Sequence, residues 1–175
     1  MTRDTTELGA RSDTEPSATP TIEPYFVKAP SHGIGDCSFQ VKAVVPERTF
    51  WEKAMLLHEE SYRADAPKAR LSRHYYDLWC LLGGGVAERA IADPDLARRV
   101  AEHRRIFFRK NKTTHDSMRP GSLRLVPARE ALSDWKRDYE AMRETMFFGE
   151  PPTFGEVIGV VKEIEDRINR PAAAN

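Results

Sequence analysis

The sequence predicts a mainly helical α+β fold, in which a short strand-containing segment (residues 1–45) precedes a helical domain (residues 46–175). Up to Val45 the apolar residues alternate with polar ones, whereas from Pro46 onward they recur every three to four positions, the spacing of one helix face. Residues that start and stop helices then recur at helix-length intervals. The 175 residues suffice for one ordinary domain with its own core.

The N-terminal part predicts little regular structure. Residues 1–35 are rich in Thr, Ser, Pro and Gly, which favours a flexible lead-in or a long irregular loop. Two stretches, Thr21–Val27 and Ser38–Val45, alternate polar and apolar residues and predict short strands. We therefore expect at most two or three short strands before residue 46.

From residue 46 onward the sequence predicts a bundle of four to six helices. Pro46 suits a first helical position, Asp93 an N-cap, and Thr153 with Glu156 forms a T-x-x-E capping box. A polar loop and a brief extended segment, residues 110–122 and 123–126, are expected between the fourth and fifth helices. The expected helices cover about residues 46–63, 68–82, 86–92, 94–109, 127–148 and 154–169.

Composition excludes several classes of protein. No run of 18 apolar residues is present, and residues 1–20 contain no apolar stretch typical of a secretory signal. Cys37 and Cys80 stand far apart with no metal-ligand spacing, which favours a reducing, cytoplasmic location. Lys and Arg together number 27, as do Asp and Glu, so net charge predicts no partner. His58-Glu59 lacks the second histidine of a zincin, and no phosphate-binding glycine loop occurs.

Lys53 is the first candidate functional residue. Its neighbours one helical turn away are Phe50, Leu56 and Leu57, so a lysine interrupts an apolar stripe. Such a side chain either extends along the surface into water or directs its ammonium into a pocket, where it can bind phosphate oxygens.

Asp77 is the second candidate. It forms a solvated i,i+4 ion pair with Arg73, or it orients Lys53 or a phosphate across two consecutive helices. Both interpretations are compatible with the residues alone.

A basic stretch follows in the fourth helix, with two phenylalanines in it. Cations interleaved with aromatic rings are typical of RNA-binding surfaces, although basic residues late in a helix also interact with its dipole or form a solvated face. The residues are Arg98, Arg99, Arg104, Arg105, Arg109, Lys110 and Lys112, with Phe107 and Phe108.

Four segments, in order, resemble the AbiEii/AbiGii family of nucleotidyltransferase toxins. The start ELGARSDTEPSATPTIEPYF is similar to a strand and loop of that family, and PERTFWEKAMLLHEESYR and SRHYYDLWCLL resemble the two helices that follow its nucleotidyltransferase core. The stretch from Gly121 to Asn169 resembles the C-terminal bundle, including a D-Y-x-x-M element at Asp138, Tyr139 and Met142.

The resemblance implies a fold and an activity. Residues 1–45 would be a strand remnant of a nucleotidyltransferase fold, and residues 46–175 its helical C-terminal domain. The complete enzyme would use Mg²⁺ and a nucleoside triphosphate to modify an RNA, such as tRNA, or a protein. It would belong to a toxin–antitoxin or phage-defence pair, with a cognate antitoxin as partner.

The resemblance also implies roles for individual residues. Lys53 and Asp77 carry over as catalytic residues, and Lys53 and Arg73 as nucleotide-binding residues. Glu7 is an additional candidate carboxylate for a metal. RNA contact would run through Arg98, Arg104, Arg105, Arg109 and Lys110.

The sequence departs from the family pattern at the metal site. No G-S turn followed by a D-x-D pair occurs, so the chain is expected to begin inside the fold, as a truncated reading frame, one half of a split gene, or a remnant with a new role. The isolated chain is then expected to bind no metal or nucleotide and to be inactive. The alternative is a non-catalytic helical module that binds an antitoxin or RNA.

Overall fold

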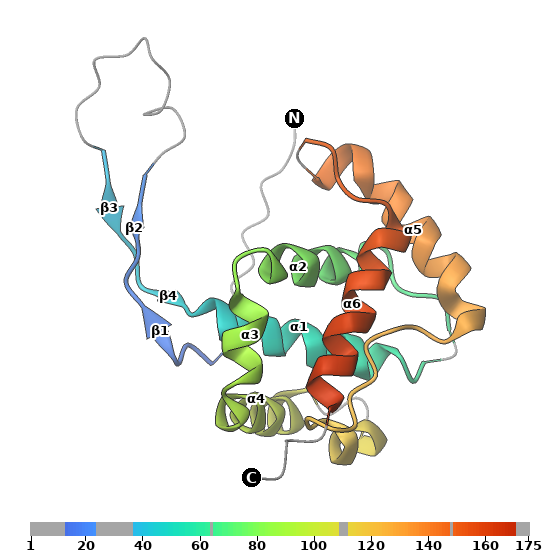
Figure 1. Ribbon diagram of the computed structural model, residues 1–175, viewed down its shortest axis with the longest axis horizontal. Helices are drawn as coiled ribbons and strands as arrows, with labels where there is room; N and C mark the ends of the chain where they lie inside the picture. Colours follow the sequence, from blue (N-terminus) through green and yellow to red (C-terminus); the bar gives the residue numbers. More distant parts are fainter. Residues whose placement is uncertain (1–12, 24–36, 64, 109–111, 148, 171–175) are drawn as a thin grey trace. The chain divides into compact units, whose positions relative to one another are not determined.

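The computed structural model describes residues 13–23, 37–63, 65–108, 112–147 and 149–170, apart from the side chains of Lys112, Thr113 and Glu144 (Figure 1). The chain divides into two compact units, Met1–Val45 and Pro46–Asn175. Each unit is described by itself below.

The described part of the first unit is an antiparallel ribbon. Strand β1 (Ser17–Ala18) pairs with β4 (Ala43–Val44), and β2 (Thr21–Ile22) pairs with β3 (Phe39–Gln40). The prediction of at most three strands is wrong, because the ribbon holds four strands of two residues each among the described positions. Pro20 lies between β1 and β2 and has no N–H to donate, although its carbonyl accepts from Val41.

The second unit is helical, and the predicted class, mainly α with short strands, is confirmed. Six α-helices lie in its described part, within the predicted range of four to six. Two 3₁₀-helices, η2 (Lys112–Ser117) and η3 (Arg129–Ala131), occupy connections. The α-helices are α1 (Pro46–Glu60), α2 (Arg73–Leu82), α3 (Val86–Ile91), α4 (Pro94–Phe107), α5 (Leu132–Met146) and α6 (Phe154–Asn169).

Helix α1 lies at the centre of the bundle. It packs against α2, α3 and α4, and α6 covers α2 (Figure 1). Phe50, Trp51, Ala54 and Leu57 are fully buried, so α1 is apolar over a wider arc than a surface helix needs. Within this core the indole N–H of Trp51 donates to the carbonyl of Ala90 at 3.1 Å, which ties α1 to α3.

The predicted caps explain where α4 and α6 begin. The Asp93 carboxylate accepts from the Leu96 N–H at 3.0 Å, and Pro94 occupies the first turn of α4. Thr153 and Glu156 form the predicted capping box at the start of α6. Both helices therefore begin where short-range side-chain chemistry places them.

Two segments differ from the prediction because their backbones bond to distant side chains. Residues 68–72 form a turn, not the first turn of α2, and Arg70 has a left-handed φ of 65°. Residues 123–126 are irregular, not a strand: the Leu125 and Val126 N–H groups donate to the Glu165 carboxylate at 2.5 and 3.0 Å. A carboxylate on α6 replaces the neighbouring strand that this segment would otherwise need.

Candidate functional site

Helices α1 and α2 bring three polar side chains together. The Lys53 Nζ lies 2.8 Å from Oδ2 of Asp77. The His74 Nδ1 lies 3.2 Å from Nζ and 3.3 Å from the same carboxylate oxygen. Lys53 and Asp77 keep 26% and 35% of their side chains exposed, whereas His74 keeps 7%. The cluster has a buried imidazole beneath an ion pair that reaches solvent.

The geometry distinguishes between the interpretations that the sequence left open. The ammonium of Lys53 ends on α2 and bonds to Asp77, so it does not simply extend into water. No ion pair between Arg73 and Asp77 is found in the described part of the chain, and Arg73 is exposed. The functional roles expected for Lys53, Asp77 and Arg73 remain predictions.

Burial and contact set the charge states in this cluster. Burial lowers the pKa of His74, with the Lys53 ammonium acting in the same direction against the hydrogen bond to Asp77. Burial alone would raise the pKa of Asp77, but hydrogen bonds from His74 and Lys53 outweigh it, and the net pKa is lowered. At neutral pH the cluster therefore contains a neutral imidazole and a carboxylate paired with an ammonium.

The arrangement leaves at least one N–H donor of Lys53 without a partner in the cluster. A lysine ammonium has three N–H donors, and Asp77 takes one. With its proton on Nε2, His74 accepts a second from Lys53 through Nδ1; with its proton on Nδ1, it donates to Asp77 instead. In both tautomers at least one N–H of Lys53 remains, on a side chain that is 26% exposed. The exposed pair contributes at most about 1 kcal/mol to stability.

Asp138 positions the start of α2 and was not assigned this role from the sequence. Its carboxylate accepts from the N–H of Arg70 at 2.7 Å and from the N–H and Oγ of Ser72 at 2.8 and 2.5 Å. The next residue, Tyr139, is buried and donates from its hydroxyl to the carbonyl of Pro152 at 2.9 Å. The D-Y-x-x-M element thus connects α5 to the turn that orients His74 and Asp77.

The described residues do not fit a divalent metal. No group of three His, Cys, Asp or Glu side chains with metal-binding geometry occurs among them, and the one carboxylate of the cluster is already bonded to Lys53. The sequence Asp93-Pro94-Asp95 has D-x-D spacing, but Asp93 caps α4 and Asp95 pairs with Arg98. Glu7, the candidate metal ligand, lies outside the described residues.

The basic stretch is only partly a surface, and one of its expected RNA contacts is wrong. Arg104 is buried and forms a bidentate pair with Glu59 of α1, with Nε–Oε1 and Nη2–Oε2 distances of 2.9 and 2.8 Å. Its guanidinium also lies 4.8 Å from the ring centroid of Phe108. Arg104 therefore joins α4 to α1 and cannot face RNA.

The other members of the stretch differ in what they offer. Arg98, Arg99 and Arg105 are all exposed. Of these three, Arg98 forms ion pairs, with Asp95 and Glu102, among the described residues. Arg109 and Lys110 lie outside the described residues. Contact between RNA and the exposed members remains a prediction.

Within the described residues no helix is long and apolar enough to cross a membrane. The fold and the cluster together define a mainly helical α+β protein with a partly exposed ammonium–carboxylate pair on two consecutive helices. Comparison of sequences then identifies the family. Residues 5–166 match the family described as nucleotidyl transferase AbiEii toxin, type IV toxin–antitoxin system, and the chain belongs to that family. No curated protein and no solved structure matches the chain.

Proposed function

We propose that this chain is the helical part of a toxin that transfers a nucleotide from a nucleoside triphosphate to an RNA acceptor. Membership of the family supports a nucleotidyltransferase-like role in a toxin–antitoxin system. The observation that supports a site in this chain is the 2.8 Å contact between Lys53 and Asp77. Lys53 binds phosphate oxygens of the triphosphate, and Asp77 holds its ammonium in place.

The roles follow from the chemistry of the three groups. Lys53 is a compact cation with a free N–H, which suits the triphosphate charge. Asp77 fixes the direction of the ammonium through the 2.8 Å contact between Nζ and Oδ2. Arg73 is exposed one turn before Asp77 and supplies a second cation to the phosphates.

The metal chemistry belongs to another segment in this proposal. The family reaction needs carboxylates that hold Mg²⁺, and the described residues offer no such group. The purified 175-residue chain should therefore transfer no label from radiolabelled triphosphates to total tRNA with Mg²⁺ or Mn²⁺. Transfer above the rate of a heat-treated sample would contradict the proposal that another segment supplies the metal-binding carboxylates.

The site itself is tested in cells. The chain is expressed together with, or fused to, a segment that carries the G-S…D-x-D motif, and growth arrest is measured. Lys53→Ala and Asp77→Ala should each abolish arrest while the circular dichroism melting curve stays within a few degrees of the parent. The matched controls are Lys162→Ala and Asp166→Ala, which remove an exposed Lys–Asp pair at 2.7 Å on α6 and should leave arrest intact.

A charge exchange separates a functional lysine from a structural ion pair. The double variant Lys53→Asp, Asp77→Lys retains opposite charges on α1 and α2 but moves the ammonium to the other helix. It should recover the stability lost in the single variants without recovering growth arrest. Full arrest by this double variant, or by either alanine variant, would end the assignment. Growth arrest without nucleotide transfer would instead support a binding module.

Phage defence and the antitoxin extend the same proposal. A toxin that modifies tRNA halts translation, and this would limit phage replication in an infected cell. The antitoxin would be encoded with the toxin, and its co-expression should restore growth. Growth that is not restored by any neighbouring gene would contradict this part.

A further inference from the structure

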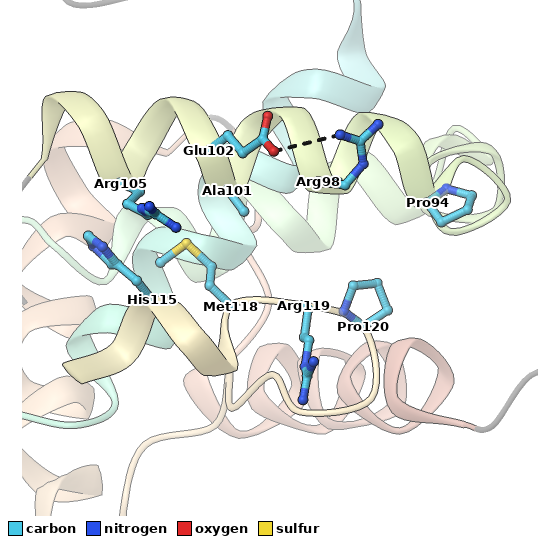
Figure 2. Close-up of a pocket in the computed structure, with 9 residues that line it drawn as sticks. All are labelled: Pro94, Arg98, Ala101, Glu102, Arg105, His115, Met118, Arg119 and Pro120. Carbon is cyan, nitrogen blue, oxygen red and sulfur yellow. Dashed lines mark ion pairs between the residues drawn. The ribbon is translucent and has the colours of Figure 1, made fainter. Parts of the chain in front are cut away.

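A groove lies between α4 and the loop that follows η2, separate from the Lys53 cluster. It encloses about 280 Å³, close to the lower end of small-ligand pockets. Its walls are mainly apolar. They come from Pro94, Arg98, Ala101, Glu102 and Arg105 of α4, and from His115, Met118, Arg119 and Pro120 across the groove (Figure 2).

One end of the groove is suited to an anion. Figure 2 shows Arg105 and His115 together at that end, beside Met118, whereas the guanidinium of Arg119 points away from α4. No ion pair of Arg105 is found among the described residues. The Nε2 of His115 is buried and makes no hydrogen bond within that part of the chain. A buried polar atom without a protein partner calls for an explanation, and a ligand or water at this end of the groove would supply the missing hydrogen bond.

The rest of the groove offers apolar surface. Ala101 lies between the two ends, and the exposed Pro94 and Pro120 lie toward the far end (Figure 2). On the rim Arg98 and Glu102 form an ion pair at 3.6 Å. This long, exposed pair presents N–H donors and carboxylate acceptors side by side, which is the combination that recognises the edge of a nucleobase.

We propose that this groove binds a single phosphorylated nucleotide, with its phosphate at the Arg105 and His115 end and its base against Ala101, Pro94 and Pro120. Charge complementarity at one end and an apolar surface with a polar rim at the other match the two parts of a nucleotide. The nucleotide is either free in solution or the terminal or looped-out residue of an RNA strand. The proposal does not depend on the Lys53–Asp77 contact, because it concerns binding and no transfer step.

The experiment measures binding to the purified chain by isothermal titration calorimetry. The probes are the four nucleoside 5′-monophosphates, a six-nucleotide RNA with a 5′-phosphate, inorganic phosphate and an acidic peptide. We expect saturable binding of at least one monophosphate or of the RNA, and weaker binding of inorganic phosphate and the peptide. Binding of RNA without free monophosphates would identify RNA as the source of the nucleotide.

The variant Arg105→Glu should weaken this binding by tenfold or more, since it reverses the charge at the phosphate end. Arg99→Glu is the matched control, because it makes the same change on the same helix at an exposed residue outside the groove. It alters only the general surface charge and should change the affinity less than about twofold. Both variants are checked for an unchanged melting temperature, and His115→Ala provides a second change at the same end.

Several results would overturn the proposal. These are no saturable binding of any nucleotide probe, an equal loss in Arg105→Glu and Arg99→Glu, inorganic phosphate binding as tightly as the nucleotides, or tighter binding of the acidic peptide.

Discussion

Removing the Asp138 carboxylate should loosen the connection that orients α2. Asp138 accepts three hydrogen bonds from Arg70 and Ser72, of which the two to Ser72 are partly buried. Hydrogen bonds to a charged acceptor contribute about 1.5–3 kcal/mol each when desolvated, and less near solvent. For Asp138→Ala we therefore expect a loss of about 2–3 kcal/mol in the free energy of unfolding. For a domain of this size that corresponds to a fall in melting temperature of about 10 °C.

The assay is urea unfolding followed by circular dichroism, with amide hydrogen exchange as a local measurement. Asp138→Asn keeps one acceptor oxygen and should lose about half as much as Asp138→Ala. The control Glu140→Ala removes a carboxylate of the same helix whose pair with Arg143 is exposed and long, at 3.4 Å, and should cost under about 0.5 kcal/mol. Equal losses in the two alanine variants, or unchanged exchange of the Ser72 amide in Asp138→Ala, would refute the reasoning.

Three further predictions concern stability. Arg70→Gly should leave stability equal or raise it by up to about 1 kcal/mol in urea unfolding, because glycine relieves the positive φ of 65°. Arg104→Ala should cost about 3–5 kcal/mol by the same assay, because it leaves Glu59 buried without its cation, whereas Arg98→Ala on the exposed face should cost under about 1 kcal/mol. Burial lowers the pKa of His58, so the unfolded chain binds a proton near pH 6.5 that the native chain does not. The free energy of unfolding should therefore keep its full value at pH 7.5 and fall as the pH drops below about 6.5. An unchanged free energy of unfolding from pH 7.5 to 5 would contradict this.

The contacts of His58 show why its protonation should be unfavourable. Its Nδ1 accepts from the Arg124 N–H at 2.9 Å, so the proton of the neutral ring is on Nε2, which lies 3.0 Å from the Ser117 hydroxyl. A second proton would remove the acceptor for Arg124. It would also place a charge beside the Arg124 guanidinium, and burial with this repulsion outweighs the Thr114 hydrogen bond and the Glu59 carboxylate, which favour the charged ring.

The parts of the fold that the sequence predicts are those determined by neighbours along the chain. The capping residues Asp93 and Thr153 bond to backbone groups three positions away, so the starts of α4 and α6 can be read from a few residues. The turn at residues 68–72 and the irregular segment at 123–126 cannot, because Asp138 and Glu165 lie far along the chain from the amides that they bind.

The same distinction explains the outcome for individual charged residues. Arg104 continues the helical spacing of the buried Leu96, Ala97 and Val100, so its place on the inner face of α4 follows from the sequence. Nothing close in sequence, however, indicates that Glu59, 45 positions earlier, lies opposite it. His74 could have been recognised, since it precedes Asp77 by three positions on one helix face. The contact between Lys53 and Asp77 spans two helices. The residues alone left it open beside an Arg73–Asp77 pair, and the family resemblance favoured it before the structure placed the two side chains 2.8 Å apart.

The two proposed sites depend on the same central helix. Lys53 leaves α1 toward α2, while Glu59, six positions later on α1, bonds to Arg104 and so fixes α4, whose outer face carries Arg105 and one wall of the groove. A change in the Glu59–Arg104 pair should therefore weaken nucleotide binding in the groove while the Lys53–Asp77 contact persists. Loss of Asp138 should instead weaken the Lys53–Asp77 site and leave nucleotide binding in the groove intact. Asp138 holds the start of α2, and no hydrogen bond found in the described residues joins it to α4. Comparing Arg104→Ala with Asp138→Ala in both the binding and the growth assays thus separates the two sites without altering a residue of either.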